Sequence, residues 1–260
     1  MESLISFQHV SIVRQGRFLL DDVTWETKRS EHWAILGANG AGKTTLLQTI
    51  LGYLWPSKGQ IHVLTHQLGK YDVRELRKSI GFVSTNMDSR LEADQSALAI
   101  TVSGRYAAYG LYEDIRKEDR EEAMHFLSMM EAGQLATEPY QLLSQGEKQK
   151  VLIARSLMAH PSILILDEPC NGLDFPSRER LIQTIQNLCS TIDAPQVLYV
   201  THYPDEIMPA ISHTLLLRDG SIVGTGLKEE VLTEELLSMT FAIAVQVSFQ
   251  NNYPVVRLKH

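Results

Sequence analysis

A glycine-rich stretch with one lysine and two threonines carries the clearest chemistry in this sequence. Residues 37–45 read GANGAGKTT. Glycines let consecutive backbone N–H groups turn inward around phosphate oxygens, because they adopt conformations that other residues avoid. In such a loop Lys43 reaches the terminal phosphates and the Thr44 hydroxyl can ligate Mg²⁺. The predicted phosphate-binding residues are Gly37, Ala38, Asn39, Gly40, Ala41, Gly42, Lys43, Thr44 and Thr45.

The residues on either side of this stretch supply the context that a phosphate loop requires. An apolar run over residues 32–36 precedes it, and a helical run over residues 46–51 follows it. The N-terminus of such a helix carries about half a positive charge and points at the same anion. The alternative is a glycine-rich turn between a strand and a helix with no ligand, but the strand, loop and helix together favour nucleotide binding.

Two adjacent carboxylates end another apolar run. Asp167 and Glu168 follow the four apolar residues 163–166, which are typical of a parallel strand buried on both faces. Ligands of open α/β sheets bind at the C-terminal edge of such strands. Asp167 is suited to hold Mg²⁺, and Glu168 to orient or deprotonate an attacking water. The alternative is an acidic strand end that only caps a turn.

Residues 143–150, LSQGEKQK, open a helix that runs to about Met158. Ser144 and Glu147 form the pattern of a capping box, which explains both residues without any ligand. This pattern does not explain Gly146, because glycine in the first turns of a helix costs about 1 kcal/mol relative to alanine. We therefore expect a close approach to the backbone here, for which an anion bound by free N–H groups is one candidate.

His202 closely follows a third buried run, residues 197–200, with Thr201 between them. Taken alone, it is more often a structural histidine with satisfied hydrogen bonds. Its expected place at the same sheet edge as Asp167 favours contact with a terminal phosphate, because a neutral imidazole donates one hydrogen bond and accepts another.

Composition excludes several classes of protein. The 260 residues are 44% hydrophobic, enough for a substantial core, and the formal charge of −7 argues against direct nucleic-acid binding. Cys170 and Cys189 are the only cysteines, which is typical of a reducing compartment and fits neither a disulfide framework nor a zinc site. No apolar segment approaches the roughly 20 residues of a membrane-spanning helix.

Runs typical of strands alternate with helical runs, which predicts an α/β fold. We expect a core with a mainly parallel sheet and flanking helices, formed by residues 1–86 and 161–260 and beginning with antiparallel strands. Asp219-Gly220 between two apolar runs predicts a hairpin. The spacing over about residues 87–160 is helical, so this part is expected to be an inserted α-helical subdomain.

In this order the motifs resemble those of the nucleotide-binding domain of the ATP-binding cassette (ABC) superfamily, a group of P-loop NTPases, over nearly the whole chain. GANGAGKTT resembles the Walker A loop, LSQGE the ABC signature, ILILDEP the Walker B strand, NGLD the D-loop and VTH the switch-histidine loop. The later parts look most like the ATPase subunits of molybdate-type and iron-siderophore-type importers.

The resemblance implies an ATPase that forms a head-to-tail homodimer with two ATP molecules and Mg²⁺ at its interface. Glu168 would be the general base, Asp167 the carboxylate on the Mg²⁺ side, and His202 the γ-phosphate sensor. The D-loop and signature residues would contact nucleotide held by Lys43 of the other chain. These residues are Ser144, Gln145, Gly146, Glu147 and Asp174.

Two positions depart from the family pattern. Where the family has a glutamine that contacts Mg²⁺ and relays closure to the membrane subunit, this chain has Ser84-Thr85-Asn86, in which Thr85 or Asn86 can offer an oxygen instead. The aromatic residue that stacks on adenine also has no clear match. Arg14, through its guanidinium plane, and Phe18 are the two candidates.

Two functions are compatible with these motifs. The first is the ATPase subunit of a transporter, cytoplasmic and peripheral on the inner face of the cell membrane, bound to transmembrane subunits supplied by other chains. The second is a soluble ATPase that acts as a mechanical clamp without a transporter. Tyr106, Tyr109 and Tyr112 recur every three residues and either pack in the helical subdomain or form an aromatic partner surface.

Overall fold

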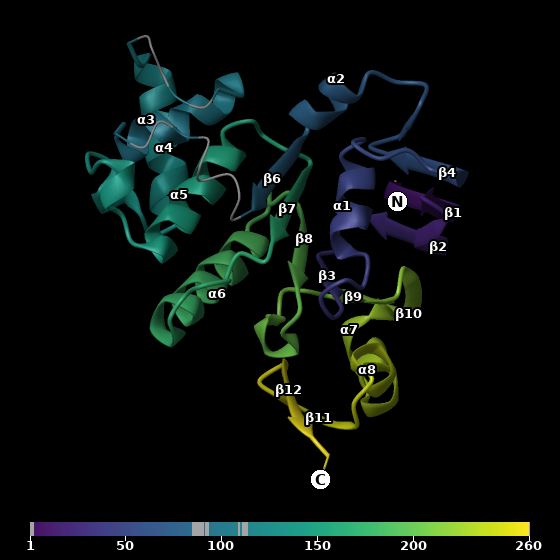
Figure 1. Ribbon diagram of the computed structural model, residues 1–260. Helices are drawn as coiled ribbons and strands as arrows, with labels where there is room; N and C mark the ends of the chain where they lie inside the picture. Colours follow the sequence, from purple (N-terminus) through teal and green to yellow (C-terminus); the bar gives the residue numbers. More distant parts are fainter. Residues whose placement is uncertain (1–2, 85–90, 92–93, 109, 111–113, 260) are drawn as a thin grey trace. The chain divides into compact units, whose positions relative to one another are not determined.

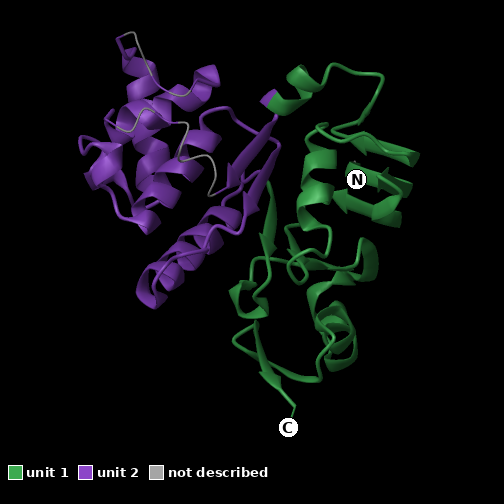
Figure 2. Ribbon diagram, viewed as in Figure 1, with its two compact units in different colours: residues 1–77, 196–260 green, residues 78–195 purple. Residues whose placement is uncertain are grey.

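The computed structural model describes residues 3–84, 91, 94–108, 110 and 114–259. The chain forms two compact units, the first from residues 1–77 and 196–260 and the second from residues 78–195 (Figure 2). The second unit is larger than the helical insertion expected from the sequence. The reason is that two strands and a long helix of the α/β part have their contacts with this segment.

Antiparallel strands open the first unit, as predicted. They are β1 (Ser3–Arg14), β2 (Arg17–Lys28), β4 (Lys58–Val63) and β5 (His66–Gln67), in the order β2-β1-β4-β5. The turn between β1 and β2 consists of Gln15 and Gly16, both with positive φ, as a tight hairpin turn requires.

Parallel strands form the centre of the first unit. The strand β3 (Trp33–Leu36) pairs in parallel with β8 (Gln196–Thr201) and β9 (His213–Arg218). All residues of β3 and β8 are buried, as expected of strands covered on both faces. The strand β10 (Ser221–Leu227) pairs antiparallel with β9 through the turn at Asp219-Gly220, which confirms the predicted hairpin.

The remaining elements of the first unit surround these strands. The helix α1 (Lys43–Ile50) lies beside the antiparallel sheet and contacts β2 (Figure 1). After β10 the chain forms α7 (Lys228–Val231), α8 (Glu234–Phe241) and a hairpin of β11 (Val245–Gln250) and β12 (Tyr253–Leu258). The hairpin accounts for the alternating pattern near the end of the sequence.

The second unit combines two parallel strands with helices. The strand β6 (Ile80–Ser84) pairs with β7 (Ile163–Asp167) although about eighty residues separate them. The helical part predicted between them is present. Its helices are α3 (Ala97–Ser103), α4 (Lys117–Met129) and α5 (Gln145–Leu157), and α6 (Phe175–Cys189) follows β7.

The elements of the two units confirm the predicted fold class. The chain is an α/β protein with parallel strands, an N-terminal antiparallel sheet and a helical segment. In the described ranges, no helix has the length and apolar character needed to cross a membrane. The short elements are α2 (Val73–Lys78), η2 (Gly104–Tyr106), η3 (Gly133–Leu135), η4 (Tyr140–Leu142) and η5 (Pro204–Glu206).

Candidate functional site

The glycine-rich stretch forms the connection between β3 and α1 in the first unit, as predicted. The strand ends at Leu36 and the helix begins at Lys43. The N-cap of α1 is Gly42, in the left-handed region with φ 110° and ψ 0°, and no side chain caps the helix. Its first N–H groups are therefore the donors from which a bound anion would accept hydrogen bonds.

Close packing fixes the backbone of this loop. A Cβ added at Gly37 would lie 2.4 Å from the carbonyl oxygen of Leu217, and one at Gly42 would lie 3.2 Å from that of Leu19. The predicted β9–β10 turn supports the loop as well, because Gly220 N–H donates to Ala41 O over 2.9 Å. The loop is thus held between β2 and the β9–β10 hairpin, a support that the sequence pattern does not reveal.

The loop lysine lies inside the curve of its own loop. Lys43 is 7% exposed, and its Nζ donates to Gly37 O at 2.8 Å and to Ala38 O at 3.3 Å. Carbonyl oxygens at the start of the loop therefore hold the ammonium against the loop. Thr44, the proposed metal ligand, is exposed in the first turn of α1, and Thr45 is half-buried.

His202 lies at the same sheet edge as this loop. In the pairing of β3 with β8, Leu36 is opposite Thr201, so that Gly37 and His202 are the next residues of two adjacent parallel strands. His202 is half-buried, and its ring lies 4.0 Å from that of Tyr203, centroid to centroid. The structure therefore brings together the two predicted phosphate contacts of the first unit.

The two candidates for adenine stacking lie at one end of the β1–β2 hairpin. Phe18 is opposite Val13 in the pairing, and Arg14 is opposite Arg17. Phe18 is 53% exposed and immediately precedes Leu19, whose carbonyl oxygen lies against Gly42. Arg14 is also exposed. An exposed aromatic ring next to the phosphate loop favours Phe18, and both residues stay predictions.

The second unit holds the two predicted carboxylates. Asp167 is the last residue of β7 and is opposite Ser84 of β6, and it is half-buried. Glu168 follows with φ 50°, a left-handed conformation that is uncommon for a residue with a side chain. This conformation ends the strand abruptly. Thr85, the predicted substitute metal ligand, lies outside the described residues.

The capping box of the signature stretch is present. Ser144 is the N-cap of α5, and its backbone N–H donates to Glu147 Oε2 over 2.8 Å. Ser144 and Gln145 are exposed, whereas Gly146 is buried. A Cβ at Gly146 would lie 3.3 Å from Cβ of Ser177 in α6. The close approach expected at Gly146 is therefore made by a neighbouring helix, and a bound anion is not needed to explain a glycine at this position.

Asp174 of the NGLD stretch is the N-cap of α6. Its Oδ1 accepts a hydrogen bond from Ser177 N over 2.9 Å. Hydrogen bonds from Ser177 lower the pKa of the Asp174 carboxyl below its ordinary value, because they favour the charged form. This cap explains Asp174 without a nucleotide, so its contact with nucleotide stays a prediction.

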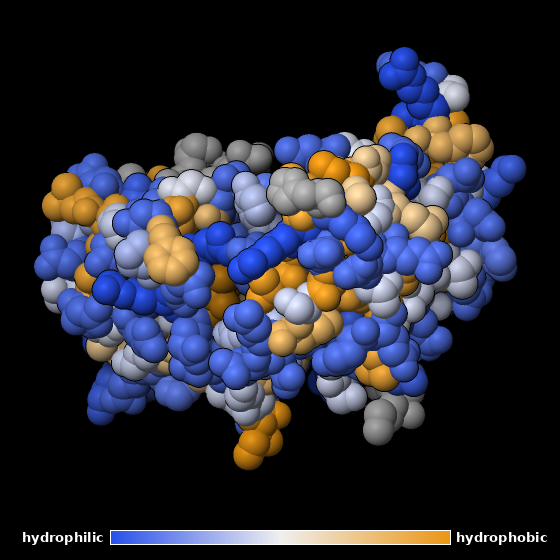
Figure 3. Space-filling view, turned by 90° about the horizontal axis from the view of Figure 1, so that it is seen from below, coloured by the Kyte–Doolittle hydropathy of each residue, from blue (hydrophilic) through white to orange (hydrophobic). Residues whose placement is uncertain are grey.

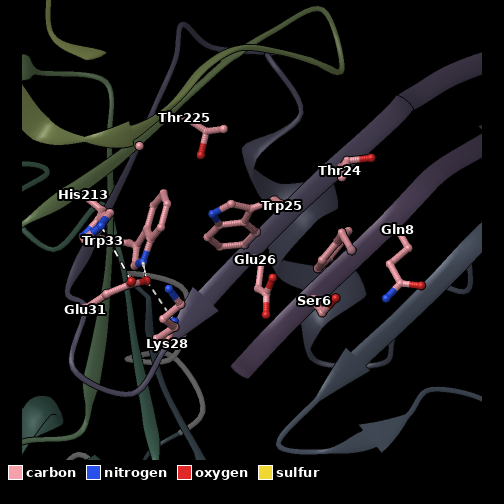
Figure 4. Close-up of a pocket in the computed structure, with 12 residues that line it drawn as sticks. Ser6, Gln8, Thr24, Trp25, Glu26, Lys28, Glu31, Trp33, His213 and Thr225 are labelled. Carbon is pink, nitrogen blue, oxygen red and sulfur yellow. Dashed lines mark hydrogen bonds and ion pairs between the residues drawn. The ribbon is translucent and has the colours of Figure 1, made fainter. Parts of the chain in front are cut away.

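A pocket of about 420 Å³ lies elsewhere in the first unit, among β1, β2 and the start of β3 (Figure 4). Trp33, the first residue of β3, stacks on His213 and meets the edge of Trp25 at 5.4 Å between ring centroids. Glu31 Oε2 accepts a hydrogen bond from Trp33 Nε1 over 3.1 Å. These residues lie at the opposite end of β3 from the phosphate loop, so the pocket is separate from the predicted site.

Of the three tyrosines, only Tyr106 is among the described residues. It is 49% exposed, and its hydroxyl donates to Asp119 Oδ2 over 2.6 Å. This hydrogen bond raises the pKa of Tyr106 above its ordinary value. Tyr106 is therefore not a core residue of the helical part, and its ring is accessible on the surface.

Comparisons with known sequences agree with the motifs. A model described as "ABC transporter" matches residues 20–171. The chain is 43% identical to YlmA of Bacillus subtilis (strain 168), an uncharacterized ABC transporter ATP-binding protein, over 96% of both chains. It is 29% identical to the hemin import ATP-binding protein HmuV of Escherichia coli O157:H7, over 99% of this chain and 100% of that protein.

Solved structures give the same result for the fold. The cbiO1 protein of Clostridium perfringens, part of the ABC transporter complex cbiONQ, matches with a TM-score of 0.80 and 26% identity over 92% of this chain and 94% of that chain. The ATP-binding cassette MJ0796, a dimer in a post-hydrolysis state bound to ADP and Pi, matches with a TM-score of 0.70 and 26% identity over 86% of this chain and 98% of that chain.

Proposed function

The chain belongs to the ABC transporter family as an ATP-binding and ATP-hydrolysing subunit, and from this we propose that two copies close head to tail on two Mg²⁺–ATP to drive transport through separate membrane subunits. One observation supports the proposal most. The pairing of Leu36 with Thr201 brings the phosphate loop and His202 to one edge of the first unit. A transferable γ-phosphate needs donors from several directions, and this edge supplies two of them.

In this proposal the loop N–H groups and Lys43 bind the phosphates of ATP. Two features support it, the left-handed N-cap at Gly42 and the position of Lys43 Nζ within the loop. Phe18 stacks on the adenine, with Arg14 as the second candidate. His202 contacts the γ-phosphate by donating a hydrogen bond from a ring N–H to a phosphate oxygen.

Thr44 and Asp167 would hold Mg²⁺. Both residues offer oxygen atoms, which are the ligands that Mg²⁺ prefers, and neither is fully buried. When bound, the cation neutralises part of the charge of the phosphates. Thr85 is the third proposed ligand from the sequence.

Glu168 is the proposed general base. It follows β7 directly, and its positive φ directs the chain away from the strand at this residue. Such a conformation costs on the order of 1–3 kcal/mol and is frequent at functional sites. A carboxylate adjacent to the metal-binding Asp167 is suited to orient a water and accept its proton.

The signature residues act on the nucleotide of the other copy in this proposal. Ser144 and Gln145 are exposed at the N-terminus of α5, where N–H groups favour an anion. ATP would bind the closed dimer better than the open one, so that binding closes the dimer and hydrolysis releases it. The dimeric state of MJ0796 bound to ADP and Pi supports this arrangement by similarity.

We place the protein in the cytoplasm, on the inner face of the cell membrane, through a partner with transmembrane helices. The exposed ring of Tyr106 is a candidate for that contact. On the face drawn in Figure 3, apolar side chains lie in small groups among polar ones. The altered glutamine position, Ser84-Thr85-Asn86, favours the alternative of a soluble clamp, but Thr85 and Asn86 lie outside the described residues. The relatives named above support the transporter instead.

The general base can be tested by a single isosteric substitution. Glu168→Gln is expected to retain ATP affinity, to lose steady-state turnover and to accumulate as an ATP-bound dimer, because water activation is lost while binding groups stay. Glu179→Gln, on α6 of the same unit and half exposed, is the matched control with normal turnover. Retained turnover in Glu168→Gln would overturn the assignment.

The membrane partner has a separate test. The chain is expected to purify from detergent-solubilised membranes of its source in a stoichiometric complex with a hydrophobic subunit. Purification with a soluble partner, or alone, under conditions that retain the dimer would support the clamp instead.

A further inference from the structure

A buried carboxylate follows His202 by four residues in the chain. Glu206, in η5, is 3% exposed, and its Oε2 accepts hydrogen bonds from the hydroxyls of Thr201 and Tyr199. Both donors belong to β8 and are themselves buried, at 1% and 0% exposure. A hydrogen bond to a charged acceptor in a buried site is stronger than one between neutral groups.

Thr201 links Glu206 to the residue that follows His202. Its Oγ1 donates to Glu206 Oε2 over 2.5 Å and accepts a hydrogen bond from the backbone N–H of Tyr203 over 3.0 Å. One hydroxyl therefore joins the residue before His202 to the residue after it. The backbone N–H of Glu206 also donates to Tyr203 O over 3.2 Å, which closes the turn.

Hydrogen bonds from a buried lysine hold the segment after Glu206, which contains Met208 and Pro209. Lys228 is 1% exposed, and its Nζ donates to the carbonyl oxygens of Met208 and Pro209 at 3.4 Å each. It also donates to the carbonyl oxygen of Asn252, in the turn between β11 and β12, over 3.2 Å. The C-terminal hairpin thus anchors the segment that carries Glu206, and Glu206 is a fixed point rather than a mobile surface group.

We propose that Glu206 is a positioning residue for the ATPase reaction, and that it acts through Thr201 to fix the backbone on both sides of His202. The inference rests on the proposed contact of His202 with the γ-phosphate. Glu206 itself touches no substrate. Its effect is geometric, because a displacement of about 1 Å in a reacting group is enough to slow catalysis strongly.

The test is a cycle of substitutions at Thr201 and His202, measured by steady-state ATP hydrolysis. Thr201→Val removes the hydroxyl at nearly constant volume. We expect it to lower kcat about tenfold, the loss that corresponds to one buried hydrogen bond. The KM for ATP should change less than about twofold, since the phosphate loop is intact. Thr201→Ser, which keeps the hydroxyl, should retain kcat.

Two further variants control for a purely structural effect. Thr240→Val removes an equally buried hydroxyl in the same unit, which donates to Leu236 O over 2.7 Å, and should leave kcat unchanged. Glu206→Gln keeps an oxygen for Thr201 but removes its charge, and should lower kcat less than Thr201→Val does. It also provides the measurement if Thr201→Val does not fold.

The double variant decides the mechanism. In a His202→Ala background, Thr201→Val should cause no further loss of kcat, because its effect acts through the missing ring. The same tenfold loss in that background would overturn the inference, as would a normal kcat in Thr201→Val when His202→Ala is slow. If His202→Ala itself hydrolyses ATP normally, the proposed role of His202 fails, and the inference fails with it.

A spectroscopic readout supports the kinetic one and does not depend on residual activity. With histidine labelled by ¹³C, the His202 ring signal is expected to shift or broaden in Thr201→Val and to keep its position in Thr240→Val. An unchanged His202 signal in a folded Thr201→Val protein would contradict positioning.

Discussion

The phosphate loop should tolerate a methyl group far less well at Gly42 than at its neighbour Gly40. Gly42 has φ +110° and a Cβ there would lie 3.2 Å from Leu19 O, 3.2 Å from Leu20 Cδ2 and 3.3 Å from Gly220 Cα. Gly40 has φ +82°, and a Cβ there would meet nothing within 4 Å. The two positions share the strain of positive φ and differ in the space around them.

The magnitudes follow from these two contributions. A left-handed conformation costs a residue with a side chain about 1–2 kcal/mol, of which part is offset because alanine restricts the unfolded chain. We therefore expect Gly40→Ala to lower the free energy of unfolding of the ADP-bound protein by about 1 kcal/mol. For Gly42→Ala the neighbours, two of them backbone atoms, must also give way, and overpacking adds about 1–3 kcal/mol.

The assay is urea unfolding at saturating ADP. If the strained loop conformation persists in the free protein, the strain lowers the free energy of unfolding of the free protein. If the loop relaxes in the free protein, nucleotide binding must restore the strained conformation, and the nucleotide affinity falls instead. Unfolding of the bound state measures the sum of both losses. Gly16→Ala, in the β1–β2 turn with φ +75° and open space around it, is the control that should lose about 1 kcal/mol with or without ADP. Equal losses in Gly42→Ala and Gly40→Ala would refute the reasoning.

Three other predictions concern single side chains. Phe18→Ala should weaken ATP binding several-fold and leave competition by inorganic tripolyphosphate unchanged. If the guanidinium of Arg14 stacks instead, Arg14→Ala should show this pattern and Phe18→Ala should not. If neither variant shows it, both residues are excluded as the adenine contact. Burial lowers the pKa of Lys228 in the folded protein below its ordinary value of 10.5, which applies to the unfolded chain. At a pH between the folded and the unfolded pKa, the unfolded chain binds more protons than the folded one, so the free energy of unfolding rises with pH in this range. The free energy of unfolding of the wild type, relative to Lys228→Met, should therefore increase as pH is raised towards 10.5 in urea titrations, and a difference that falls with pH would contradict this. Burial also raises the pKa of Cys189 to about 12, and since Cys170 is buried as well, both thiols should react with a disulfide reagent only at the rate of unfolding; fast reaction of either in the native protein would contradict this.

The sequence predicts local features of the site well, because they depend on residue type over short spans. The loop after β3, the capping box at Ser144 and the turn at Asp219-Gly220 each have their own pattern, and each is present. The proline near the start of α6 also lies where a missing N–H has no cost.

Contacts between distant segments are not predictable in this way. Ser177 approaches Gly146 closely from another helix, and no spacing within the signature stretch indicates that partner. The same applies to the support of Ala41 by Gly220. Both contacts depend on how elements pack, which a single sequence does not encode in any local pattern.

The hydrogen-bond network of Glu206 is a second example. Glu206 is one of two adjacent acidic residues between β8 and β9, and a pair of charged residues after a strand is ordinarily exposed in a loop. Only the fold reveals that it is buried and accepts hydrogen bonds from Thr201 and Tyr199. Lys228 is similar, since a lysine at the start of a helix is ordinarily exposed, whereas this one is enclosed by three carbonyl oxygens.

The most direct test of the central proposal mixes two variants that are each inactive alone. Lys43→Ala lacks the phosphate contact and Ser144→Arg blocks the signature helix, so a head-to-tail dimer of the two has one complete site. In a 1:1 mixture half of the dimers are mixed, and ATP hydrolysis should recover to about a quarter of the wild-type rate if the sites act independently. No recovery, in a mixture where mixed dimers are demonstrated, would contradict a site completed by two copies of this chain.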